Sequence, residues 1–215
     1  MRSCSTLSRR RFLTAGAIAA LPLSARNPND VRIRSIDIAY EDFLYRAPIK
    51  FGGRALDRVT LLNVTCEVEG RDGKHARGFG SMPMGNVWSW PARSMGYDET
   101  LAAMKALAAR IGGLYRGNGE FGHPIDLTMA LEPACLKAAA DLSQGLPEPI
   151  PMLCSLVAAS PFDCALHDAY GKLHGRNAYQ LVGPEHLSRD LGAFLGPEFK
   201  GERLTRYLHA AAVEK

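Results

Sequence analysis

From residue 31 onward, apolar and polar residues alternate with the period of two that is typical of strands. The alternation shifts by one residue between Ile33 and Ile36, which predicts a strand with a bulge. Residues 62–68 alternate without interruption and predict a second strand. The turn at 70–73 (Gly-Arg-Asp-Gly) then predicts a hairpin that leads into a third strand over 74–80. The expected sheet is an antiparallel three-stranded meander.

The period changes to 3.6 at Asp98, where apolar residues fall on one helical stripe. Asp98 can cap the start of this helix, and the pair Gly112-Gly113 weakens its end. An amphipathic helix is therefore expected to cover the sheet. Its apolar stripe consists of Leu101, Met104, Leu107, Ala108, Ile111 and Leu114.

Further helices are predicted in the second half of the chain. Residues 125–142 are helix-like, but Pro133 removes a backbone donor, so two pieces or a kink are expected. A later helix is expected to start with Ser160 as its N-cap and to stop at Gly175, and a last one is expected over 204–213. Because strands come first and helices follow, the order indicates an α+β domain whose sheet is followed by a helical bundle.

The first 25 residues have the three parts of a secretory signal, namely a basic stretch, an uncharged apolar stretch over 12–23, and small residues at 24–25. The apolar stretch is shorter than the about 20 residues that a membrane-spanning helix needs. An arginine pair followed by Phe-Leu is the twin-arginine version, which the twin-arginine translocation machinery reads. We expect a protein exported to the periplasm or beyond, with a linker at 26–30. The export signal consists of Arg9, Arg10, Phe12 and Leu13.

Charge and cysteine content narrow the classes of function. The chain has 26 Lys and Arg and 22 Asp and Glu, and removing residues 1–25 takes away four arginines and no acid. The remaining body is therefore neutral, which argues against nucleic-acid binding. Of the five cysteines, Cys4 leaves with the signal. The other four could form two disulfides, but buried free thiols are favoured because these residues lie inside apolar periodic segments.

Three segments resemble the mandelate racemase and muconate-lactonizing branch of the enolase superfamily. Residues 31–68 contain a strand, a loop ending in Ala-Pro-Ile-Lys-Phe-Gly-Gly, and another strand. Residues 73–91 lead from a strand into a loop with two tryptophans, although Ser81 stands where the family often has glutamate. In residues 160–183, His167 stands where tryptophan is frequent, but an alanine, aspartate, glycine and lysine pattern is present. The matching residues are Ala165, Asp168, Gly171 and Lys172.

The resemblance implies that residues 31–150 form an enolase-like N-terminal capping domain and that 151–215 connect it to an incomplete (β/α)8 barrel. It also implies removal of a proton α to a carboxylate, with the enediolate held on Mg²⁺ and a Lys or His as base. A barrel of this kind takes about 250 residues, whereas only residues 173–215 follow Lys172. No residue is therefore expected as a metal ligand or a catalytic base. We expect the capping fragment of an exported racemase, dehydratase or cycloisomerase, without bound Mg²⁺ and without turnover.

Two loops, 43–58 and 81–91, would shape the substrate pocket of such an enzyme from above. Trp88 and Trp90 would either form a lid over a substrate or fold back as a hydrophobic plug on the sheet. A small carboxylate substrate is expected only if the barrel is present, and a homo-oligomer is compatible with this reading. The alternative function is an exported, non-catalytic α+β module that binds a ligand or a partner through the tryptophans. The candidate substrate-binding residues are Tyr45, Lys50, Phe51, Met82, Met84, Trp88 and Trp90.

The third segment also invites a metal interpretation. His167 and His174 would lie about two turns apart on one face of a helix, beside Asp168. Two histidines at i and i+7 are too far apart to share an ion without a third ligand. Asp168 and Lys172 are instead spaced at i and i+4, so an ion pair between them is favoured.

Overall fold

The structure is a computed structural model that describes residues 27–51 and 54–208, apart from the side chains of residues 51 and 54. No helix within these ranges is long and apolar enough to cross a membrane. The predicted export signal lies outside the described residues, with Arg9, Arg10, Phe12 and Leu13.

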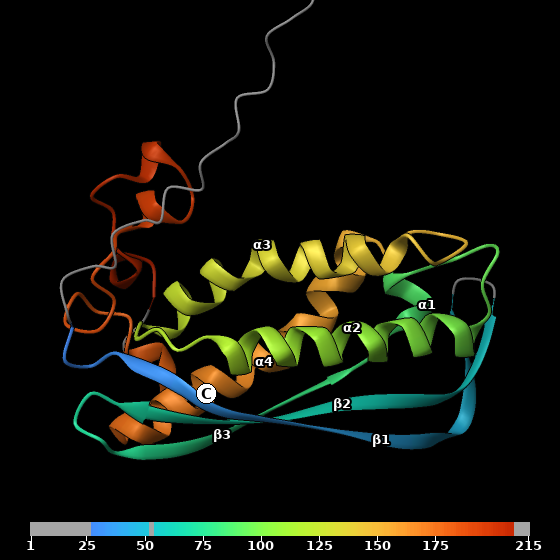
Figure 1. The fold of residues 1–215 in the computed structure, drawn as a ribbon, viewed down its shortest axis with the longest axis horizontal. Helices are drawn as coiled ribbons and strands as arrows, with labels where there is room; N and C mark the ends of the chain where they lie inside the picture. The colour runs from blue at the N-terminus through green and yellow to red at the C-terminus, as the bar shows by residue number, and fades with distance from the viewer. Residues whose placement is uncertain (1–26, 52–53, 209–215) are drawn as a thin grey trace, which may run out of the picture.

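Three antiparallel strands in the order β1-β2-β3 form the sheet (Figure 1). β1 spans Val31–Phe51, β2 spans Arg54–Gly70 and β3 spans His75–Pro83. The predicted meander is confirmed, and so is the bulge, because the register between β1 and β2 shifts between Ile33 and Ser35. The strands are longer than predicted at the end of the sheet that is distant from the 70–73 turn.

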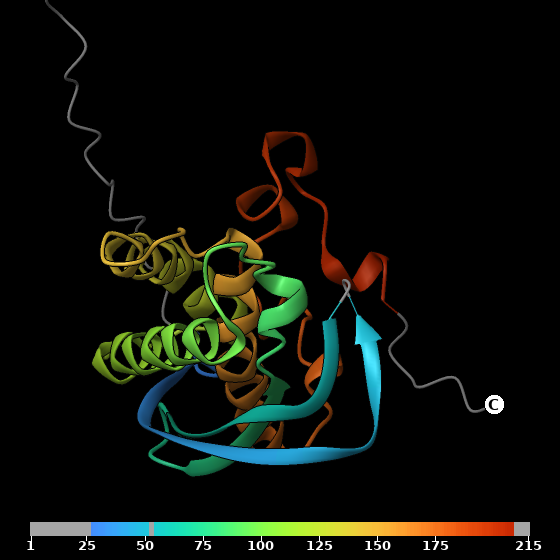
Figure 2. The ribbon, with the colours of Figure 1, turned by 90° about the vertical axis from the view of Figure 1, so that its right-hand side faces the viewer.

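The helices follow the sheet in the chain and cover one of its faces (Figures 1 and 2). The helices α2 and α4 contact the strands, and α3 packs on these two helices. The α+β class is therefore confirmed. Within the described residues, the α-helices are α1 (Asn86–Ser89), α2 (Tyr97–Gly117), α3 (Pro124–Ser143) and α4 (Met152–His174). Short 3-10 turns follow them: η1 (Ala178–Gln180), η2 (Leu191–Ala193), η3 (Pro197–Phe199) and η4 (Leu204–Arg206).

The core lies between the sheet and the helices that contact it. Leu62, Val64 and Cys66 are fully buried on β2, as the alternation of this strand predicts. On α2, Met104 and Ile111 of the predicted stripe are fully buried as well. The same hydrophobic cluster includes residues of α4, so it draws on both sides of the boundary expected at residue 150. That boundary stays a prediction.

Both predicted ends of α2 are wrong. The N-cap is Gly96, not Asp98, and its backbone N–H donates to the Glu99 carboxylate at 2.6 Å. The helix also continues through Gly112 to residue 117. Gly112 lies against β1, since a Cβ atom there would stand 2.6 Å from the Ile38 side chain. This glycine therefore serves close helix–strand packing and not helix termination.

Two prolines that were expected to limit helices lie inside them. The helix α3 continues past Pro133, and α4 begins eight residues before the predicted N-cap Ser160, which lies within the helix. Pro161 cannot donate to the Val157 carbonyl, and the Ser160 hydroxyl donates to that oxygen instead, at 2.9 Å. The predicted end of α4 is confirmed, because Gly175 closes the helix with φ 62°.

The four described cysteines are all free thiols. Cys66, Cys135 and Cys154 are buried in apolar surroundings, which agrees with the favoured interpretation of their sequence context, whereas Cys164 is exposed. Burial raises the pKa of the Cys66 thiol to about 12. These thiols act as small apolar side chains in the core.

Candidate functional site

The distal half of the β1–β2 hairpin projects beyond the core, and we call it the arm (residues 40–51 and 54–61). Figure 2 shows the arm turning up from the plane of the sheet. The bend coincides with a second register shift, where β1 residues 45–48 lie between the pairs Leu44–Arg58 and Ile49–Leu56. The segment 43–58 was predicted as a loop, and this is wrong: it forms paired strands as far as residues 51 and 54.

Apolar side chains of the arm lie in solvent. Leu44 is 81% exposed, Ile49 50% and Phe43 44%. The predicted contact residues Tyr45 and Lys50 are also exposed. The side chain of Phe51 lies outside the described residues. An extended hairpin with this much exposed apolar surface has no core of its own, which is typical of a segment that contacts another body.

The base of the arm is attached to the first turn of α2. The Arg58 guanidinium lies 2.9 Å from the Asp98 carboxylate and 4.9 Å from the centre of the Tyr97 ring. Burial raises the pKa of the Tyr97 hydroxyl, although the charge of Arg58 opposes this. The contact joins the arm to α2.

The tryptophan segment is divided between the core and the surface. Met84 and Trp90 are 1% and 3% exposed, so these two form a plug in the core rather than a lid. Met82 belongs to β3 and is partly buried against the core. Trp88 is 39% exposed on α1 and remains available to a ligand or a partner. The Asn86 amide holds α1 in place by donating to the Tyr97 carbonyl at 2.8 Å and to the Thr100 hydroxyl at 2.9 Å.

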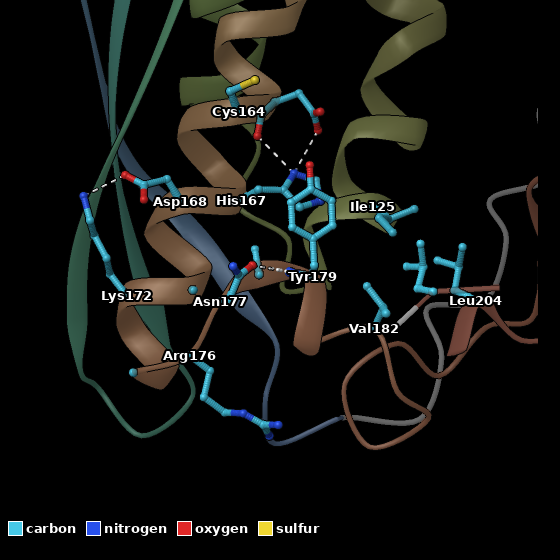
Figure 3. Close-up of a pocket in the computed structure, with 15 residues that line it drawn as sticks. Ile125, Cys164, His167, Asp168, Lys172, Arg176, Asn177, Tyr179, Val182 and Leu204 are labelled. Atoms are coloured by element: carbon cyan, nitrogen blue, oxygen red, sulfur yellow. Dashed lines mark hydrogen bonds and ion pairs between the residues drawn. The ribbon is translucent and has the colours of Figure 1, made fainter. Parts of the chain in front are cut away.

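A cavity of about 870 Å³ lies beside the C-terminal half of α4 (Figure 3). One wall is formed by α4 and the start of α3, and the other by the chain that follows α4. Apolar surface makes up most of its lining, but the lining side chains include about as many charged and polar groups as apolar ones. Typical small-molecule sites have only a few polar groups. The lining residues on α4 include Asp163, Cys164, His167, Asp168 and Lys172, and the other elements contribute Ile125, Asn177, Tyr179, Val182, Leu204 and Leu208.

His167 is the principal titratable group of this cavity. Its Nδ1 atom lies 3.0 Å from the Asp163 carbonyl and 3.1 Å from the Asp163 carboxylate. In Figure 3, dashed lines mark two interactions at the labelled His167 ring. Burial lowers the pKa of His167, but the hydrogen bond and charge of Asp163 outweigh it, so the pKa is raised. Nδ1 therefore carries a proton toward Asp163, and the ring is fixed against α4.

The remaining polar groups of the α4 wall are structural. Lys172 Nζ lies 2.7 Å from Asp168 Oδ2, which confirms the ion pair favoured from the sequence. The backbone N–H of Phe79 on β3 donates to the same carboxylate at 2.8 Å. Burial is the main cause that raises the pKa of the Cys164 thiol, and the negative charge of Asp163 raises it further. The thiol is therefore not activated as a nucleophile.

The residues present do not fit the Mg²⁺ ion that the resemblance implies. A hard cation needs several carboxylates at one point, and no group of three metal-ligating side chains occurs within residues 27–51 and 54–208. The two carboxylates of the cavity, Asp163 and Asp168, are already paired with His167 and Lys172. No catalytic step is derived through a metal for this chain.

Sequence reasoning missed one cluster of polar groups next to the cavity. His123, Tyr170 and His186 come together with His167 and His174. His123 between a glycine and a proline at the start of a helix-like stretch could have suggested an N-cap. The proximity of His123 to His186 depends on tertiary packing, so no local pattern in the sequence indicates it.

No protein-family model matches the chain, and no curated protein matches it significantly. Solved structures do match. The L-talarate/galactarate dehydratase from Salmonella typhimurium is 19% identical with a TM-score of 0.43, over 84% of this chain and 37% of the dehydratase. The L-talarate dehydratase from a Polaromonas species is 21% identical with a TM-score of 0.43, over 71% of this chain and 35% of that one. A dipeptide epimerase from Enterococcus faecalis is 15% identical with a TM-score of 0.41, over 71% and 34%.

The chain thus spans about a third of the length of these enzymes. Dehydratases and proteins described as enolases are among the matches. Matches at these scores and identities carry no conclusion about activity.

Proposed function

We propose that this chain is the capping domain of an exported, Mg²⁺-dependent enzyme of the enolase superfamily that abstracts a proton α to a carboxylate. The barrel with the metal and the catalytic base would be supplied by polypeptide beyond these 215 residues. The chain itself would bind no Mg²⁺ and would have no turnover. Its role would be to close the substrate pocket from above.

The observation that carries the proposal is the arm. Its apolar side chains face solvent, with Leu44 81% exposed, while the Arg58–Asp98 ion pair joins it to α2. Burying an apolar side chain of this size stabilises a protein by roughly 1.5–3 kcal/mol. The exposed arm lacks this stabilisation unless another body covers it. Trp88 is exposed on α1, which packs against the same end of α2. Arm and Trp88 are the parts that would lie over a substrate.

A second apolar surface supports the need for a further body. At the start of α4, Met152 is 66% exposed, Leu153 50% and Leu156 37%, and Met129 on the neighbouring α3 is 41% exposed. Met129 and Leu156 line one pocket, and exposed apolar residues grouped in this way are uncommon on self-contained monomers. A barrel packed against the helical layer would cover it.

The alternative is an exported, non-catalytic module that binds a small ligand. The specific observation that favours it is the cavity beside α4, whose volume of about 870 Å³ is in the range of small-molecule sites. Such a module would be complete without a barrel. Export by the twin-arginine machinery is part of both proposals and rests on the N-terminal sequence.

The two functions differ in the state of the purified chain. As a capping domain it should bind bis-ANS and self-associate in sedimentation velocity, and the double variant Leu44→Glu/Ile49→Glu should reduce both. Lys50→Glu is the matched control, because it adds negative charge to the same arm without removing apolar surface. A monodisperse monomer that binds no dye, with the double variant indistinguishable from wild type, would instead favour the ligand-binding module.

A further inference from the structure

Four of the six histidines in the sequence gather around one tyrosine, Tyr170 of α4. The ring centres of His123, His174 and His186 lie 5.0, 4.6 and 6.0 Å from that of Tyr170. His167 joins the group at 6.4 Å from His123. The five side chains come from the N-cap of α3, from α4 and from the turn after Gly183. We call this group the histidine cluster.

His123 is bonded in a way that requires a neutral imidazole. Its Nδ1 atom accepts a hydrogen bond from the Ile125 N–H at 3.2 Å, so the proton is on Nε2, which donates to the Leu181 carbonyl at 2.9 Å. The side chain is 1% exposed. Burial lowers the pKa of His123 to about 4, against the effect of the bond to Leu181, and the other histidines of the cluster add to the lowering.

Further hydrogen bonds that involve histidines hold the chain after α4 in place. Burial raises the pKa of the Tyr170 hydroxyl, which therefore keeps its proton and donates to Nδ1 of His186 at 3.0 Å. Burial lowers the pKa of His186. The Asn27 amide donates to the His186 carbonyl at 2.9 Å, and His174 Nε2 donates to the Asn29 carbonyl at 3.2 Å. Residues 181–188 are thus attached to the N-cap of α3, to α4 and to the segment that precedes β1.

The charged groups around the cluster offer little compensation for an added proton. Three acids already have cationic or histidine partners: Asp30 pairs with Arg71, Asp126 with Arg189, and Asp163 with His167. At His186, Glu185 favours a positive charge, whereas His174 and Arg176 oppose one. Positive charge at His123 meets three other histidines. Protonation there would also remove the acceptor that caps α3.

We propose that the histidine cluster is an acid-sensitive latch: neutral imidazoles hold residues 181–188 on α4, and protonation of His123 and His186 releases them. The released segment forms a wall of the cavity, since Val182 lies within it and Leu204 and Leu208 follow it. Release therefore removes this wall of the cavity at acid pH, whereas the attached segment completes the wall at neutral pH. The latch does not depend on the proposed capping role.

Hydrogen–deuterium exchange of the full chain, followed by mass spectrometry and corrected for intrinsic exchange rates, tests the latch. Between pH 6 and pH 4, amides within 177–208 should lose most of their protection, while those of 62–68 on β2 should stay strongly protected even though the free energy of global unfolding falls. His123→Gln retains an amide donor for the Leu181 carbonyl but cannot be protonated, so it should move the midpoint of release to lower pH. His75→Gln is the matched control, because His75 is an exposed residue of β3 outside the histidine cluster, and it should keep the wild-type midpoint.

A second variant covers the case in which His123→Gln does not fold at pH 7.5 by circular dichroism. His186→Asn offers a non-titrating acceptor to the Tyr170 hydroxyl, and it should also move release to lower pH. The proposal is overturned if residues 177–208 and 62–68 reach the same low protection at pH 4, because the transition is then global unfolding. Protection of 177–208 that does not change with pH, or a wild-type midpoint in the folded variants, overturns it equally.

Discussion

Replacing Gly78 with alanine tests the contact between β3 and α4, on which the arrangement of sheet and helices depends. A Cβ atom at Gly78 would lie 2.1 Å from the Ala165 carbonyl oxygen and 2.2 Å from the Ala169 nitrogen. Ordinary contacts of a Cβ atom begin at 3.4 Å, so strand and helix must separate by roughly 1 Å or more. Both clashing groups are backbone atoms and cannot turn aside.

The expected cost follows from this geometry. Overpacking a core typically costs about 1–3 kcal/mol, and a clash with helix backbone belongs at or above the upper end. We expect Gly78→Ala to lower the free energy of unfolding by about 3 kcal/mol or more, out of the about 5–15 kcal/mol of an ordinary domain. With a urea m-value of about 2 kcal/mol/M, the unfolding midpoint should fall by about 1.5 M.

Urea unfolding followed by circular dichroism at 222 nm measures this shift, and Gly113→Ala provides the matched control. Gly113 is an exposed glycine of α2 with no atom within 4 Å of a built Cβ. Alanine there should raise stability by about 0.5–1 kcal/mol, because it removes the helix penalty of glycine. A Gly78→Ala midpoint within about 0.3 M of wild type would refute the close approach of β3 to α4.

Three further predictions concern buried groups. The pKa of His123 is lowered to about 4 from the ordinary 6.5, so the unfolded chain binds a proton at this residue more readily than the folded chain does. The free energy of unfolding should therefore be highest above about pH 6.5 and fall by up to about 3 kcal/mol by pH 4. Urea titrations at each pH measure this change. By the same assay, Trp90→Ala should lower the free energy of unfolding by about 3–5 kcal/mol and Trp88→Ala by less than about 1 kcal/mol, because only Trp90 is buried. Equal losses would contradict the burial of Trp90 and the exposure of Trp88. In the Cys4→Ser background, a thiol reagent should modify Cys164 first, and prior reaction of the three buried cysteines would contradict their burial.

Local patterns in the sequence predicted the elements whose residues carry a local signal. Alternation identified the sheet and its bulge, and the helical stripe with Met104 and Ile111 identified α2, because burial on one face imposes these periods. The left-handed residue Gly175 identified the end of α4. The arm was missed because a bent, solvent-exposed hairpin buries neither face, so its sequence lacks the alternation that marks a half-buried strand.

Long-range contacts account for the remaining errors. Pro161 reads locally as a helix start, but the Ser160 hydroxyl takes over the carbonyl that the proline leaves free, and the helix continues. Burial of Trp90 and exposure of Trp88 depend on how α1 docks, which spacing does not determine. The histidine cluster joins residues as far apart as His123 and His186, and only the fold brings them together.

Exchange of the α-proton of a substrate tests the capping role most directly. A panel of 2-hydroxy acids and sugar acids is incubated in D2O with Mg²⁺, and loss of the α-proton signal is followed by NMR. The assay is run with this chain alone and with the polypeptide encoded by the continuation of its reading frame. We predict no exchange with the chain alone, exchange when both parts are present, and slower exchange with Trp88→Ala. Exchange by the chain alone would contradict the capping role. A continuation of the reading frame that lacks Asp or Glu residues at the ends of successive strands, and that gives no exchange, would contradict it as well.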